Sequence, residues 1–188
     1  MQGFLAISRA IDRVTGFVGR SVIWLILLAI FVSAVNAIIR KAFAISSNAW
    51  LELQWYLYGA AFMLAASQTL MQNEHVRIDI LYGMWSRKVQ HRIDLFGHIF
   101  FLLPFVLLMD VLLVPYVWRS FSLGEVSSDA GGLILWPAKS MLLWGFLLLT
   151  AQCFSEIIKK IAVMRGLIED PHPFVSEHEK AEAGEIEG

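Results

Sequence analysis

Long stretches without charge dominate this chain and most restrict what it can fold into. Residues 21–39 and 53–73 carry no charged side chain, and residues 95–118 and 131–155 carry one each. About 20 apolar residues cross the hydrocarbon core of a bilayer as a helix. Backbone groups in lipid need partners within the chain, so such stretches without strand alternation indicate helices. We therefore expect an all-α integral membrane protein with four transmembrane helices, at about 21–39, 53–72, 95–117 and 133–155.

The composition supports this class. Of 188 residues, 57% are hydrophobic and 16% are charged, whereas a soluble domain is nearer one half and one quarter. A disordered chain is excluded, and an ordinary soluble enzyme is disfavoured. The single cysteine, Cys153, cannot form an internal disulfide or a multi-thiolate metal site, and we interpret it as a small apolar filler. The net charge of −1 gives no indication of nucleic-acid binding.

The distribution of Lys and Arg predicts the orientation, because these residues are enriched in cytoplasmic connections. One side of the four-span arrangement has ten of them: Arg9, Arg13, Arg20, Arg77, Arg87, Lys88, Arg92, Lys159, Lys160 and Arg165. The other side has four: Arg40, Lys41, Arg119 and Lys139. We therefore expect both termini in the cytoplasm.

Three segments outside the spans have distinct patterns. As a helix, residues 1–20 would have an apolar face and a separate basic face. This pattern predicts either an amphipathic helix on the cytoplasmic leaflet or a cytoplasmic extension of the first span. A second amphipathic helix is predicted to begin near Ser86 and to continue into the third span. Its basic residues would attract anionic lipid headgroups: Arg87, Lys88 and Arg92. Beyond the four-helix domain of residues 21–165, residues 166–188 are acidic and predicted to be a disordered cytoplasmic tail.

Charged side chains at the span ends are the first candidates for function. Arg40 ends the first span and Glu52 begins the second, so we expect them to pair, because a half-buried charge needs a partner. The alternative is that water hydrates each of them separately. Asp110 interrupts the third span and Lys139 the fourth. Lys139 would either pair with Asp110 or extend its ammonium group to the interface.

Signs of catalysis are weak. His98 is the one histidine clearly inside a span, and a membrane haem needs two axial ligands. The sequence contains no zinc pattern, nucleophile elbow, phosphate loop or dinucleotide fingerprint. We predict no catalytic residue, no cofactor and no metal site, hence not an enzyme. A membrane anchor subunit of a redox complex, with a haem or quinone site near His98, is the alternative function.

A set of loop and span residues resembles a known family. Arg40 precedes residues 50–88, which contain Trp50, Glu52 and the string 74–79 with Arg77 and Asp79; residues 131–152 continue the match. Together they resemble the small permease subunit of tripartite ATP-independent periplasmic (TRAP) transporters, the DctQ-like family, over about residues 15–165.

The resemblance implies a role in a larger assembly. In such systems a periplasmic binding protein captures an organic acid, and a large multi-span permease subunit carries it across the bacterial inner membrane, driven by sodium. The small subunit is then a non-catalytic scaffold, in contact with phospholipids and with both partner proteins. Arg40, Glu52 and Asp79 match motif positions and would be structural or interfacial, as would Arg77. Small residues of the second span are the predicted contact with the large subunit: Gly59, Ala61 and Ala65.

Overall fold

The computed structural model describes residues 2–44, 47–73 and 85–170. Arg77, Asp79 and the predicted tail beyond residue 170 lie outside these ranges. The described part is helical: α1 (Gln2–Phe43), α2 (Asn48–Gln72), α4 (Arg87–Gly97), the π-helical turn η1 (His98–Leu102), α5 (Leu103–Ser122) and α6 (Trp136–Met164). One isolated antiparallel bridge joins Val126 and Ile134 in the α5–α6 connection. The all-α prediction is therefore confirmed.

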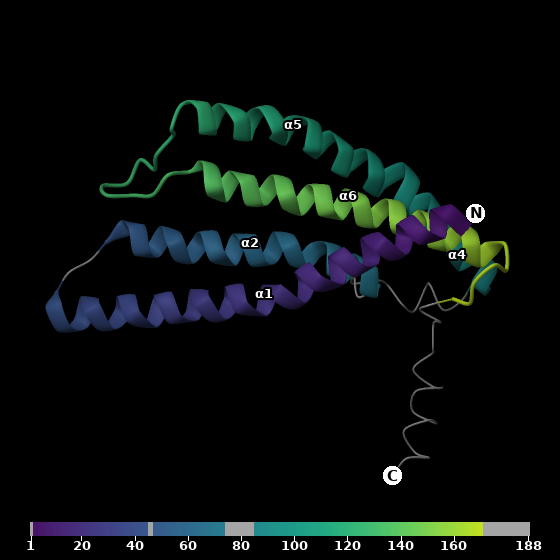
Figure 1. The fold of residues 1–188 in the computed structure, drawn as a ribbon, viewed down its shortest axis with the longest axis horizontal. Coiled ribbons are helices and arrows are strands. Elements are labelled where there is room, and N and C mark those ends of the chain that lie inside the picture. The colour runs from purple at the N-terminus through teal and green to yellow at the C-terminus, as the bar shows by residue number, and fades with distance from the viewer. Residues whose placement is uncertain (1, 45–46, 74–84, 171–188) are drawn as a thin grey trace, which may run out of the picture.

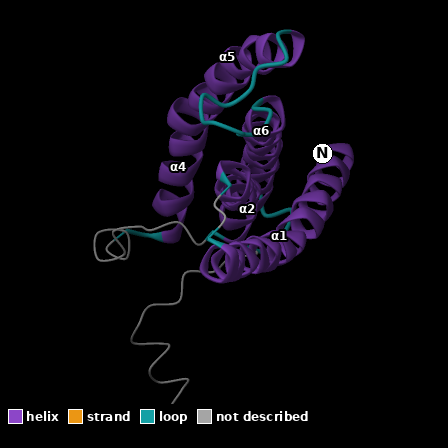
Figure 2. Cartoon of the chain, turned by 90° about the vertical axis from the view of Figure 1, so that its left-hand side faces the viewer, coloured by secondary structure: helices purple, strands orange, loops and turns teal. Residues whose placement is uncertain are grey.

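The helices lie side by side in the order α1, α2, α6, α5 (Figure 1). An end-on view places α2 and α6 between α1 on one side and the α4–α5 run on the other (Figure 2). We call the end that holds the α5–α6 connection, residues 123–135, the loop end. The opposite end, which holds the N-terminus and α4, is called the terminal end. At the terminal end, the first part of α1 crosses α6 (Figure 1).

Three helical runs among the described residues are long and apolar enough to cross a membrane: Gln2–Phe43, Lys88–Ser122 and Trp136–Met164. By composition α2 falls short of them, because it contains residues such as Gln54, Gln68 and Thr69. Four spans and cytoplasmic termini therefore stay predictions. Residues 2–20 and 21–39 belong to one uninterrupted helix, α1.

The predicted start of the third helical run is confirmed. Ser86 caps α4, and its carbonyl oxygen accepts the backbone N–H groups of Val89 at 2.9 Å and Gln90 at 3.0 Å. The run continues through η1 into α5, and η1 ends two residues before Pro104. A proline has no N–H and its ring clashes with the carbonyl four residues earlier, and a widened π turn accommodates both effects. The carbonyl of His98 in η1 accepts a weak hydrogen bond from Cys153 Sγ of α6, at 3.8 Å.

Packing between the central helices depends on small residues. A Cβ atom on Gly145 of α6 would lie 2.7 Å from Cβ of Met63 of α2, so this glycine permits the close approach. An apolar cluster of Val106, Leu113 and Phe146 joins α5 to α6. Outward faces carry large apolar side chains such as Trp24 and Phe105, as expected of helices that meet lipid or another membrane protein.

Candidate functional site

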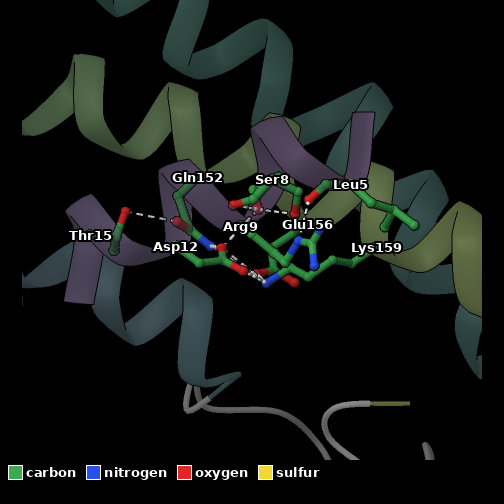
Figure 3. A network of polar contacts seen from close by, with 9 residues as sticks. Leu5, Ser8, Arg9, Asp12, Thr15, Gln152, Glu156 and Lys159 are labelled. Carbon is green, nitrogen blue, oxygen red and sulfur yellow. Dashed lines mark hydrogen bonds and ion pairs between the residues drawn. The ribbon is translucent and has the colours of Figure 1, made fainter. Parts of the chain in front are cut away.

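A buried network of polar side chains joins α1 to α6 at the terminal end (Figure 3). Residues spaced by three or four positions share one face of a helix, so Ser8, Asp12 and Thr15 of α1 face α6 together. The same spacing on α6 presents four side chains: Gln152, Ser155, Glu156 and Lys159. Most of the largest fully buried side chains of the described chain are polar, and Gln152, Thr15, Ser8 and Ser155 are among them.

Gln152 lies at the centre of this network. Its Oε1 accepts a hydrogen bond from the Thr15 hydroxyl at 2.8 Å. Its Nε2 donates to Asp12 Oδ1 at 2.8 Å and to Glu156 Oε1 at 2.9 Å. Both ends of the amide are thereby satisfied, as a fully buried side chain requires. Gln152 therefore connects two residues of α1 to the carboxylate of Glu156 on its own helix.

The charged members of the network neutralise one another in part. The Lys159 ammonium lies 3.1 Å from Asp12 Oδ2 and 2.5 Å from Glu156 Oε1. Asp12 Oδ1 also accepts from the Ser155 hydroxyl at 2.8 Å, and the hydroxyls of Ser8 and Ser155 are 2.7 Å apart. Charges away from water need partners of this kind. The network thus fixes the N-terminal part of α1 to α6.

Sequence reasoning missed this network. It left residues 1–20 as either a helix on the membrane surface or a cytoplasmic extension of the first span, and it did not associate Asp12, Thr15 or Gln152 with one another. The signal was present as matching helical spacings, 8–12–15 on one segment and 152–155–159 on the other. Polar residues at such spacing in two hydrophobic segments indicate that the two faces meet.

Two further polar contacts at the terminal end, an ion pair and a histidine–carboxylate contact, join α4 to α6 and to the chain beyond it. Lys160 Nζ lies 2.8 Å from Asp94 Oδ2, and His91 Nε2 lies 3.5 Å from Asp170 Oδ2. Together with the α1–α6 network, these contacts connect α1, α4 and α6 at one end of the bundle.

A second polar cluster holds the α5–α6 connection against α2 at the loop end. The Glu52 carboxylate accepts the backbone N–H of Leu133 at 2.6 Å and a hydrogen bond from the Ser127 hydroxyl. Asn48, one turn earlier, donates to the carbonyl oxygen of Ala130 at 3.1 Å. Gly132 leaves room for this contact, because a Cβ there would lie 2.8 Å from Glu52 Oε1. Residues 123–135 are therefore attached to the first turns of α2.

The predicted Arg40–Glu52 ion pair is wrong. Among the described residues no such pair forms: Glu52 is 8% exposed and bonds to the α5–α6 connection, whereas Arg40 is exposed in the last turn of α1. The physical reason is that a backbone N–H and a hydroxyl already satisfy the carboxylate. Glu52 is nevertheless central to a structural contact.

Of the two alternatives for Lys139, the pair with Asp110 does not form among the described residues. Lys139 forms an ion pair with Glu125 and lies 4.2 Å from the centre of the Tyr116 ring. Its hydrogen bond lowers the pKa of Glu125, which lies outside the helices. Asp110 instead accepts a hydrogen bond from the Thr150 hydroxyl of α6 at 2.7 Å. Asp110 is 9% exposed, so this contact joins α5 to α6 inside the bundle.

The three small residues predicted to contact the large subunit differ in their exposure. Ala61 is 4% exposed within the chain's own packing, and Ala65 is partly buried. Gly59 is exposed, with open space where a Cβ would be. It lies in a groove of about 290 Å³ between α2 and α6, lined also by Trp55, Met63 and Met141. Of the three, only Gly59 is exposed enough to offer an open surface to another helix.

The remaining predicted residues lie at the start of α4. Lys88 and Arg92 are exposed on this helix, and Arg87 is its first residue. Within the described ranges no three His, Cys, Asp or Glu side chains are grouped so that they could hold a metal ion. His98 lies in η1.

Comparison with known proteins identifies the family. Residues 28–163, well over half of the chain, match the family described as tripartite ATP-independent periplasmic transporters, DctQ component. No curated protein and no solved structure matches the chain. The matched segment contains α2, α4, η1, α5, nearly all of α6 and the C-terminal part of α1, from residue 28 onward, and it gives the redox alternative no support. The chain therefore belongs to the DctQ component family of TRAP transporters.

Proposed function

We propose that this protein is the non-catalytic small subunit of a sodium-coupled, binding-protein-dependent transporter for organic acids in a bacterial inner membrane. Its role is that of a fixed scaffold for the large permease subunit. A periplasmic binding protein delivers the substrate, and the large subunit carries it.

The α1–α6 network is the observation that carries this proposal. A transport path through the chain would need polar groups aimed at a passing solute, whereas Gln152, Asp12 and Lys159 are bonded to other side chains of the same chain. Thr150 and Asp110 bond to each other in the same way. Polar side chains that bond across helices hold the helices in one arrangement, which suits a stationary part.

The two ends of the bundle suit two different surroundings. Basic residues are concentrated at the terminal end, where Lys88, Arg92 and Lys160 lie, which favours a cytoplasmic position for that end. The loop end would then face the periplasm. Residues 123–135, attached to α2 by Glu52, offer a fixed surface there for the binding protein.

The groove at Gly59 is our candidate contact with the large subunit. A glycine on an exposed helix face lets another helix approach closely, and Trp55 beside it supplies a large apolar side chain. This contact would leave the internal network of the small subunit intact.

Co-purification from native membranes tests the proposal. The tagged chain should retain a large multi-span permease. Gly59→Leu should weaken this retention without unfolding the protein, because nothing lies within 4 Å of the added Cβ. Gly3→Leu is the matched control, since Gly3 has equally open surroundings far from the groove. Failure of the unmodified chain to retain a permease would contradict the proposed role, and equal retention by both variants would exclude the groove.

A further inference from the structure

An open cleft of about 390 Å³ lies beside the α1–α6 network at the terminal end. Its charged lining consists of Arg9, Asp12 and Lys159, and Gln2 adds an amide. Leu5 and Ile168 form apolar parts of the wall. The volume is within the usual range of small-ligand sites. The cleft thus combines charged groups and apolar surface at an end of the bundle where a membrane helix emerges.

The charges in the cleft are not equally available to a ligand. Lys159 is 12% exposed and already contacts Asp12 and Glu156. Arg9 is exposed, and only its Nε is bonded, to the carbonyl oxygen of Leu5 at 3.3 Å. Within the described residues Arg9 forms no ion pair, and Figure 3 shows its guanidinium group beside Asp12 and Lys159. The cleft therefore offers one cation with free N–H donors.

Exposed apolar side chains lie close to Arg9 along α1. The neighbouring α1 residues Phe4 and Ile7 are 59% and 54% exposed. A helix segment with exposed apolar side chains beside basic ones lies at the boundary between headgroups and acyl chains. A guanidinium group there is well placed to bind a phosphate oxygen with two parallel hydrogen bonds.

We propose that this cleft binds the phosphodiester headgroup of a glycerophospholipid. The free N–H groups of Arg9 donate to the phosphate oxygens, the Gln2 amide supplies a further donor, and the acyl chains follow the apolar side chains of Leu5 and Phe4. The site is separate from the exposed cations Lys88 and Arg92 of α4. A lipid bound there would cover the cleft beside the point where α1 crosses α6.

Lipid binding to the purified, delipidated complex tests this assignment by native mass spectrometry. Phosphatidylglycerol is added, and the diacylglycerol with the same chains and inorganic phosphate serve as separate probes. Arg9→Gln should weaken phosphatidylglycerol binding about tenfold, as expected for the loss of one charge-assisted contact. Arg13→Gln, which removes an exposed arginine one turn further along α1 and outside the cleft lining, should change it less than about twofold.

Three results would overturn the assignment: equal binding by the two glutamine variants, equal binding of diacylglycerol, or displacement of the lipid by an equal concentration of inorganic phosphate. Arg9→Lys keeps the positive charge and serves as a control for a folding defect. Its affinity for phosphatidylglycerol should lie between those of the unmodified protein and Arg9→Gln. The assay requires no uptake, so its failure is distinct from a failure of the proposed scaffold function.

Discussion

Thr15 on α1 donates a hydrogen bond of 2.8 Å to Oε1 of Gln152 on α6, across 137 residues of sequence. Both side chains are fully buried. This bond and those around it hold the first part of α1 across α6, so the terminal end of the bundle is joined by polar contacts as well as by apolar packing.

Replacement of Gln152 by Ala should destabilise the protein by about 2 kcal/mol, because Thr15, Asp12 and Glu156 each lose a buried partner. Unfolding in mixed micelles with increasing denaturing detergent measures the change. Gln72→Ala, at an exposed position in the last turn of α2, should leave the midpoint unchanged. Similar midpoints for the two variants would show that the network contributes little.

Replacement of Glu52 by Gln should loosen the α5–α6 connection. The new amide group retains one oxygen but places N–H donors where the Leu133 N–H and the Ser127 hydroxyl also donate. Hydrogen exchange should accelerate for the backbone amides of residues 125–135. Glu169→Gln, an exposed position at the other end, serves as the control, and unchanged exchange in Glu52→Gln would contradict the attachment.

The Glu125–Lys139 pair should make stability depend on acid pH. The pKa of Glu125 in the folded protein lies below its ordinary value of 4.5, chiefly because of its hydrogen bond with Lys139. The pair therefore stabilises the fold above that ordinary value, and its contribution disappears as pH falls through the lowered pKa. Thermal melting should show Glu125→Gln below the unmodified protein at neutral pH and level with it in strong acid.

A substitution of Lys139, the other member of this ion pair, tests the same contact. Lys139→Met should raise the pKa of Glu125, and Glu125→Gln should then cause little further loss of stability in the Lys139→Met background. Fully additive losses at neutral pH would mean that the two side chains act independently.

Replacement by alanine should change the stability of the protein in opposite directions at two helical glycines, Gly145 and Gly59. Gly145→Ala places a methyl group 2.7 Å from Cβ of Met63 and 3.0 Å from its carbonyl oxygen, so α2 and α6 must separate, at a cost of about 1–3 kcal/mol. Gly59→Ala meets nothing within 4 Å and should stabilise by about 0.5–1 kcal/mol through reduced backbone freedom. Unfolding midpoints of the two variants measure the contrast; equal effects would contradict the close crossing.

Features that depend on local sequence were predictable. The start of α4 after Ser86 and its continuation into the next apolar stretch follow from a serine cap and a regular apolar stripe, both visible within a few residues. The long apolar stretches likewise predicted that the protein is all-α. The π-helical form of η1 was not predictable, because the sequence does not show how a helix accommodates a proline.

Long-range pairings were not predictable in the same way. Arg40 and Glu52 are close in sequence and opposite in charge, but Glu52 instead receives a backbone N–H from Leu133, 81 residues later. Lys139 likewise pairs with Glu125 and not with Asp110. Which helix faces meet depends on the packing of the whole bundle, and charge alone does not specify it.

A reversible lock between α1 and α6 tests the scaffold role most directly. Ser8 and Ser155, whose hydroxyls are 2.7 Å apart, are both replaced by Cys, and Cys153 by Ala to prevent mispairing. The complex is placed in proteoliposomes with its binding protein and with the sodium gradient that the proposed function requires, and uptake of the solute which the binding protein carries is measured. A fixed scaffold predicts equal uptake in the oxidised and reduced states. Uptake that is lost on oxidation and restored by reduction would show that α1 moves against α6 during transport and would contradict the account.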